Sequence, residues 1–127
     1  MSALRTAIMT PFVSGTDLYD AIEGRMYYAR APKETEEPYV VFSIPNRLPE
    51  DTFSASIDNV TIQFSIFAAT ADDADDITTD CLALYDNTDL GDCVVLQRTL
   101  IIPARPSSSD EDITWQADID FFTIQEV

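Results

Sequence analysis

Histidine, the residue that most often serves as a general base or a zinc ligand, is absent from this chain of 127 residues. The two cysteines, Cys81 and Cys93, therefore have no imidazole with which to form a Cys–His nucleophile. Two cysteines are also too few for a disulfide framework, so we expect both to be reduced and buried. The three glycines form neither a phosphate-binding loop nor a dinucleotide-binding motif. The sequence thus predicts no catalytic residue and no cofactor.

Carboxylates are the remaining groups that could do chemistry, as ligands of a metal ion. Four aspartates within residues 72–76 lack the glycine turn and the distal glutamate of a calcium-binding loop, and the helix dipole explains their crowding at a helix start. Asp118 and Asp120 alternate along a predicted strand, where a solvated face is the simpler interpretation. The acidic run at residues 110–112 falls in a predicted loop. We therefore expect no metal site, and residues 72–76 leave only weak, nonspecific cation binding open.

The charge balance argues against two classes of ligand. Seven basic residues against 23 acidic ones give a net charge of -16, and such a surface repels nucleic-acid phosphates and anionic lipid. No apolar run approaches the roughly 18 residues needed to span a bilayer, so we expect no membrane association. The acids are mostly aspartate and Lys33 is the only lysine, a composition typical of proteins in concentrated salt. There, screening over about 3 Å at 1 M makes a dense negative surface tolerable, so a halophilic host is one hypothesis.

The length fits one domain over residues 1–127, and its first half shows clear boundaries. The ring of Pro11 ends a first helix, Thr16 is placed to cap a second helical turn, and Gly24 suits the left-handed position after it. The expected elements are a helix over 3–8, a helical turn over 18–22, a strand over 25–29, a polar loop over 31–38, a strand over 39–44 closed by Pro45, and an exposed excursion over 48–56.

In the second half, strict alternation over residues 58–68 predicts a half-buried strand with Val60, Ile62, Phe64 and Ile66 on one face. A helix over 71–85 follows, capped by Thr70, and then strands over 93–102 and 113–124 joined by a hairpin loop over 103–112. Phe122 and Ile124 break the alternation of the last strand. Either a bulge re-aims the chain there or another subunit covers the second face.

This order of elements predicts an α+β fold. Runs of strands joined by short turns favour a mainly antiparallel sheet of four to five strands, with two helices packed on one face.

Three segments of the first third resemble a known family. Residues 24–28 (Gly-Arg-Met-Tyr-Tyr), the Ala31-Pro32 step and residues 38–42 (Pro-Tyr-Val-Val-Phe) are similar to the tail-completion, or tail-terminator, proteins of long-tailed phages and archaeal viruses. The later alternating strand, the Ala/Asp-rich helix and the final strand follow the same order of elements. The resemblance therefore covers nearly the whole chain in the order of its elements, with its sequence motifs in the first third.

The resemblance implies a structural virion protein and not an enzyme. Members assemble in the host cytoplasm into a ring, typically a hexamer, at the head-proximal end of the tail tube. The implied partners are further copies of the chain, the tail tube protein and the head–tail connector, and DNA would slide through the acidic lumen without specific binding. Two other hypotheses stay open: a head-completion stopper from the same neck region, and a small soluble binding domain of a halophile.

Arginines are the residues most expected at an interface between such acidic subunits, because copies repel one another unless local charge pairs form. Arg25 and Arg30 lie beside the polar loop 31–38, and either one could meet an acidic loop of a neighbouring subunit. The alternative for Arg25 is a pair within its own chain. The residues expected at the subunit interface are Arg25, Arg30, Pro32, Pro38, Tyr39 and Arg105.

Overall fold

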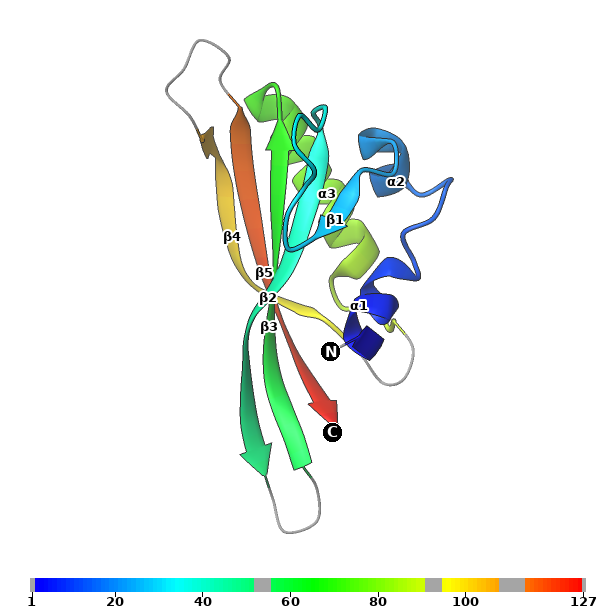
Figure 1. Ribbon diagram of the computed structural model, residues 1–127, viewed down its shortest axis with the longest axis vertical. Helices are drawn as coiled ribbons and strands as arrows, with labels where there is room; N and C mark the ends of the chain where they lie inside the picture. Colours follow the sequence, from blue (N-terminus) through cyan, green and yellow to red (C-terminus); the bar gives the residue numbers. More distant parts are fainter. Residues whose placement is uncertain (1, 52–55, 91–94, 108–113, 127) are drawn as a thin grey trace.

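A computed structural model describes residues 2–51, 56–90, 95–107 and 114–126 of the chain. Its helices and strands follow the order α1 (Ser2–Met9), α2 (Asp17–Ile22), β1 (Met26–Tyr28), β2 (Tyr39–Asp51), β3 (Ser56–Ala68), α3 (Ala71–Tyr85), β4 (Gln97–Pro106) and β5 (Trp115–Glu126). Within these ranges the five strands form one sheet in the order β1-β2-β3-β5-β4 (Figure 1). The pairs β2–β3, β3–β5 and β4–β5 are antiparallel, and β1 runs parallel to β2.

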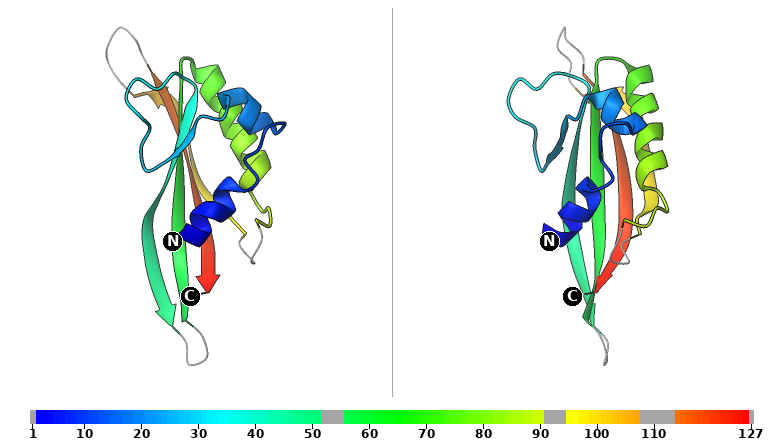
Figure 2. Two further views of the ribbon diagram at one scale, coloured as in Figure 1. Left: turned by 45° about the vertical axis from the view of Figure 1, so that its right-hand side comes forward. Right: turned by 90° about the vertical axis from the view of Figure 1, so that its right-hand side faces the viewer.

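The helices lie on one face of this sheet (Figure 2). The longest helix, α3, packs on β3, β5 and β4, and α2 packs on α3. We call the opposite side the helix-free face. The predicted α+β class, a mainly antiparallel sheet with helices on one face, is confirmed. In the described ranges the predicted first helix and helical turn are two separate helices, so this face carries three helical segments.

Side-chain caps fix the starts of α2 and α3. The hydroxyl of Thr16 accepts a hydrogen bond from the backbone N–H of Tyr19 at 3.3 Å, and that of Thr70 accepts one from Asp73 at 3.1 Å. Gly24 has a φ of +75° just after α2, and a Cβ there would lie 2.9 Å from the hydroxyl oxygen of Tyr19. The caps and the glycine position predicted from the sequence are confirmed.

The core fills the space between the sheet and the helices. The fully buried residues of β3 that point into it are Val60, Ile62, Phe64, Ile66 and Ala68, and the first four are those that the alternation predicts. The ring of Phe64 lies centrally, with centroids 5.0 Å from Tyr85, 5.4 Å from Phe121 and 5.8 Å from Phe42. Tyr85 also donates a hydrogen bond of 2.7 Å to the carbonyl oxygen of Ile8, which joins the end of α3 to α1.

The predicted end of the second strand at Pro45 is wrong, because β2 continues to Asp51. The β2–β3 register shifts between Ser43 and Asn46, so that Pro45 sits in a bulge where its missing N–H breaks no ladder hydrogen bond. Beyond the bulge, residues 46–51 of β2 and 56–61 of β3 form an arm that extends past the helices (Figure 1). We call this hairpin the arm.

β4 ends later than predicted, at Pro106 rather than at residue 102. The proline-rich segment over 103–112 is a loop in the sequence interpretation, whereas β4 runs through it to Pro106. The β4–β5 register shifts between Ile102 and Arg105, and this irregularity accommodates Pro103.

The alternation of β5 is not broken by a bulge. β5 pairs with β3 residue by residue from Trp115 to Glu126 without a register shift. Thr123, which is buried, takes the inward position, and Phe122 and Ile124 lie on the helix-free face. The bulge alternative is therefore wrong, and the other alternative, a covered second face, stays a prediction.

Some expectations fall on residues whose structure is not described. These are the outer part of the predicted excursion at 52–55, the burial of Cys93, and the acidic run at 110–112, which all lie outside the described residues.

Candidate interaction surface

The described residues bring together no group that resembles a reactive centre. Burial raises the pKa of the Cys81 thiol far above its ordinary value, so this cysteine stays protonated and unreactive. Within the described ranges no three histidine, cysteine, aspartate or glutamate side chains are grouped so as to hold a metal ion. None of the helices described is long and apolar enough to cross a membrane.

The expectation that Asp118 lies on a solvated face of its strand is wrong. Its side chain is 5% exposed on the helix-free face, beneath the guanidinium of Arg105, which is 43% exposed. Asp118 accepts hydrogen bonds from Ser65 at 2.6 Å, from Gln116 at 3.2 Å and from Arg105. Arg105 also donates to the carbonyl oxygen of Gln116 at 3.2 Å. The two charges neutralise each other across the β4–β5 pair, so Arg105 has a structural partner within its own chain.

Arg25 likewise has partners in its own chain. Its guanidinium donates to the carboxylate of Glu23 at 2.8 Å and to the carbonyl oxygen of Pro38 at 3.0 Å. These bonds tie the end of α2 to the start of β2, which is the intrachain alternative considered for this residue. Arg47 pairs with Asp58 across the arm.

Three cations, Arg5, Arg30 and Lys33, have no carboxylate within ion-pair distance among the residues that the structure describes. Arg30 lines a hollow of about 420 Å³ on the helix-free face together with Pro32 and Tyr39. Tyr39 stacks there on Phe67 with ring centroids 4.9 Å apart. The structure therefore brings three residues of the predicted interface set together at one place and leaves Arg105 at another.

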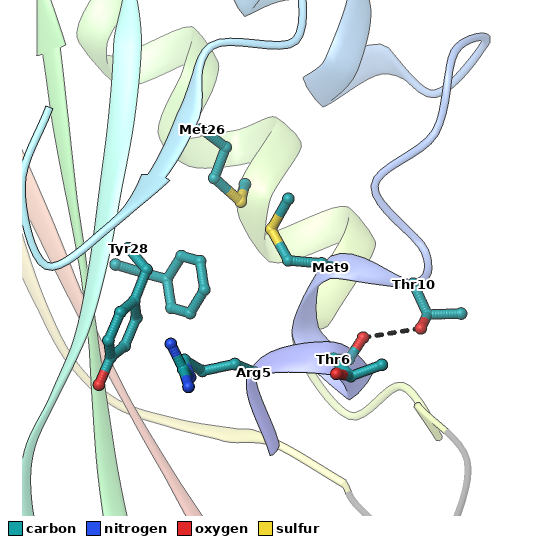
Figure 3. A pocket seen from close by; sticks show the side chains of 7 residues that line it. Arg5, Thr6, Met9, Thr10, Met26 and Tyr28 are labelled. Carbon is teal, nitrogen blue, oxygen red and sulfur yellow. Dashed lines mark hydrogen bonds between the residues drawn. The ribbon is translucent and has the colours of Figure 1, made fainter. Parts of the chain in front are cut away.

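Sequence analysis missed a second hollow, between α1 and β1 (Figure 3). Its volume is about 550 Å³, and its lining residues are Arg5, Thr6, Met9, Thr10, Met26, Tyr28 and Phe42. The guanidinium of Arg5 lies 4.7 Å from the ring centroid of Tyr28, a cation–π contact. We call this hollow the α1–β1 groove. The sequence feature that could have revealed this groove is the four-residue spacing of Arg5 and Met9, which puts both residues on one side of a helix.

Large apolar side chains are exposed at a further place, around β4. The residues of this β4 patch are Val95, Leu100, Phe122 and Ile124, of which Leu100 is 50% and Ile124 is 53% exposed. Ile101 is also exposed, but it lies on the helix side of β4, because it stands opposite the core residue Ile119. A shallow hollow of about 240 Å³ lies among Val95, Phe122 and Ile124. The sequence had already singled out Phe122 and Ile124, because their apolar side chains break the alternation of the last strand.

The outer surface of α2 and α3 is acidic. Burial, and after it the charges of Asp17 and Asp76, raise the pKa of Asp80 above its ordinary value. A raised pKa means that the folded chain holds this proton more tightly than the unfolded chain does. Ionised Asp80 therefore destabilises the fold above its folded pKa, and the penalty disappears as the pH falls below the unfolded value near 3.8.

Asp80→Asn should accordingly stabilise the protein at pH 7, by about 0.2–0.5 kcal/mol for each like-charged neighbour that is relieved. The gain in melting temperature should vanish near pH 3 and shrink in molar salt, where the repulsion is screened. Asp72→Asn is the matched control, because Asp72 lies in the first turn of α3, where the helix dipole favours a negative charge. A stabilisation by both variants, or by neither, would contradict this assignment of Asp80.

Comparison with known proteins gives a match in structure only. No protein-family model and no curated protein matches the chain. Among solved structures 32 chains match it. One of them belongs to the structure titled "Virion of native gene transfer agent (GTA) particle", with a TM-score of 0.74 and 16% sequence identity over 98% of this chain and 95% of that chain. At this identity the likeness establishes a shared fold over nearly the whole length of both chains.

Proposed function

We propose that this chain is a structural virion protein of a phage-like particle. The observation that carries the proposal is the end-to-end likeness to a chain of a gene transfer agent virion, which leaves almost no part of either chain unmatched. A small domain that matches a virion component over its full length is more naturally a component of the same kind than a domain borrowed for another use. Its site of action would be the virion, after assembly in the host cytoplasm.

The specific role that we propose is that of a tail terminator. The segments that resemble tail-completion proteins, residues 24–28 and 38–42, form β1 and the start of β2, where the helical layer joins the sheet. A subunit of this kind would form a ring, in our proposal a hexamer, at the head-proximal end of the tail tube. It would end tube growth and present a docking face to the head–tail connector.

A purely structural role agrees with the chemistry of the side chains. The buried Cys81 is held in its thiol form, and the buried carboxylate of Asp118 is neutralised by Arg105. The strongly acidic surface also suits a ring through which DNA passes, because phosphates are repelled rather than bound. These features support a ring subunit that needs neither a cofactor nor a metal.

The interface that we propose for this ring includes the β1 edge of the sheet. Arg30, Pro32 and Tyr39 gather on the helix-free side of that edge, and Arg30 has no carboxylate partner in the described part of the chain. A neighbouring acidic subunit would supply the missing charge. The contribution of Arg25, Pro38 and Arg105 to this interface would be indirect, because they hold β1, β2 and β4 in place.

Electron microscopy of particles produced without this protein tests the proposed role. Loss of a terminator should give tails of uncontrolled, excessive length, because nothing stops polymerisation of the tube protein. Loss of a head-completion stopper should instead give heads that leak DNA beside tails of normal length. Particles restored by supplying the wild-type chain are the control. Particles of normal form and yield in its absence would contradict any role in the neck, and would favour the small binding domain of a halophile.

A further inference from the structure

The α1–β1 groove and the β4 patch lie at opposite edges of the sheet. β1 is the first strand in the sheet order and β4 is the last. The right-hand view of Figure 2 looks onto the helices, and in it α1 and β1 lie to the left while β4 lies on the right behind α3. Six of the eight large apolar side chains that are exposed in the described residues belong to α1 and the turn after it, to β1, or to the β4 patch. The other two are Leu48 of the arm and Ile101 on the helix side of β4. Exposed apolar surface is thus concentrated at two unlike places.

The two surfaces also differ in charge. The groove contains the cation Arg5, and none of its lining residues within the described chain is a carboxylate. The β4 patch has a carboxylate beside it, because Asp120 stands directly opposite Leu100 in the β4–β5 register and points to the same helix-free face. The side chain of Asp120 is half-buried and accepts a hydrogen bond from Gln63 at 3.1 Å. The two apolar surfaces are therefore complementary in charge, with the cation Arg5 at the α1–β1 groove and the carboxylate of Asp120 beside the β4 patch.

Backbone pairing between the two sheet edges is disfavoured. β1 is only three residues long, and β4 is interrupted by Pro103 and by two register shifts. Such irregular edges resist addition of another strand. A contact at these edges must consequently be made by side chains, which is what the exposed apolar groups at both places offer.

We propose that the α1–β1 groove of one copy receives the β4 patch of a second copy, with Leu100 directed into the groove and Asp120 beside Arg5. Contact between two copies of the groove would set Arg5 against Arg5, and contact between two patches would set Asp120 against Asp120. The head-to-tail contact avoids both repulsions, which matters in a chain with a net charge of -16. A head-to-tail contact between unlike surfaces gives a ring when the rotation between neighbouring copies closes, as the proposed ring subunit requires, and an open filament when it does not. This proposal rests on the proposed ring subunit and names its interface.

Two variants, each blocking one side of the contact, test the proposal. Arg5→Glu places a negative charge in the groove and leaves the β4 patch intact, and Leu100→Glu does the reverse. Each variant by itself should associate at least about 100-fold more weakly than the wild type and should be monomeric. Arg5→Glu sets two like charges against each other and Leu100→Glu sets a charge against an apolar groove, and either change costs several kcal/mol at an interface. Mixed in equal amounts, the two variants should give a heterodimer and nothing larger, since each then has one usable surface.

Sedimentation and native mass measurement of the full chain give the readout. Thr79→Glu, at an exposed position of α3 outside both surfaces, is the control for added negative charge and should assemble as the wild type does. Circular dichroism verifies that the variants are folded. Met9→Asp and Ile124→Asp form a second pair, one on each surface, for the case in which a first variant does not fold.

The outcomes separate this interface from the proposed function. The proposed interface would be overturned if Arg5→Glu or Leu100→Glu still formed rings like those of the wild type. It would also be overturned if both variants were monomeric and their mixture gave no heterodimer. Neither result would contradict the ring itself. Loss of assembly in only one of the two variants would likewise overturn the proposed interface, because the proposed contact needs both surfaces. A wild-type chain that never assembles would overturn the ring itself.

Discussion

Replacing Phe64 with alanine should lower the free energy of unfolding by about 3–5 kcal/mol. Phe64 is fully buried, and its ring contacts Phe42, Tyr85 and Phe121, so truncation leaves a cavity that aromatic neighbours fill poorly. A loss of this size is a large share of the 5–15 kcal/mol typical of a small domain. Urea titration at one fixed protein concentration measures it, because the apparent stability of an oligomer depends on concentration.

Phe67→Ala is the matched control, since it makes the same truncation three residues further along β3. Phe67 lies on the helix-free face, is only half-buried, and packs on Tyr39. Its loss should cost less than about 1.5 kcal/mol, in keeping with a single aromatic pair. Equal losses for both variants would show that the two faces of the sheet are covered to the same extent within one chain.

Arg105→Ala should lower the free energy of unfolding by about 2–4 kcal/mol at neutral pH, because it leaves the carboxylate of Asp118 buried without its countercharge. Hydrogen bonds from Ser65 and Gln116 remain, which places the expected loss below the largest values known for broken buried pairs. Arg105→Lys should recover part of the loss, since it restores the charge without the second bond to the Gln116 carbonyl. Urea titration is again the measurement.

Arg98→Ala tests whether that loss is specific to the buried pair. Arg98 lies on the same strand and pairs with Asp86 at 3.5 Å, but its side chain is 56% exposed. Removing an exposed partner of this kind should cost less than about 1 kcal/mol. If Arg105→Ala were as mild as Arg98→Ala while the ring was lost, Arg105 would act at the subunit interface, as its place in the sequence suggested, and not in the fold.

Local signals predicted most of the fold. The alternation of β3, the apolar stripe of α3 and the Thr16 and Thr70 caps each depend on residues within a few positions of one another, so the sequence alone displays them. Strand ends were less predictable, because a proline such as Pro45 or Pro103 stops a strand unless the partner strand permits a bulge. Whether a bulge can form at the proline depends on the register with the partner strand, and no local sequence pattern reveals that register.

The candidate surfaces depended on tertiary contacts and were harder to foresee. Asp118 reads as a solvated carboxylate until the β4–β5 register lays Arg105 over it. Arg5 and Tyr28 are far apart in the chain and meet only because α1 lies beside β1. The sequence shows that Phe122 and Ile124 break the alternation of the last strand, but only the unshifted β3–β5 register shows that they point outward and that no bulge re-aims the chain.

The mass of the full-length protein in solution tests the ring most directly. We expect one closed assembly of defined mass, six copies in our proposal, which does not grow further as the protein concentration is raised. Its fraction should increase from 0.05 M to about 1 M salt, because screening relieves the repulsion between subunits that each carry a charge of -16. A chain that stays monomeric at every concentration and salt, or one that forms open chains of unlimited length, would contradict it.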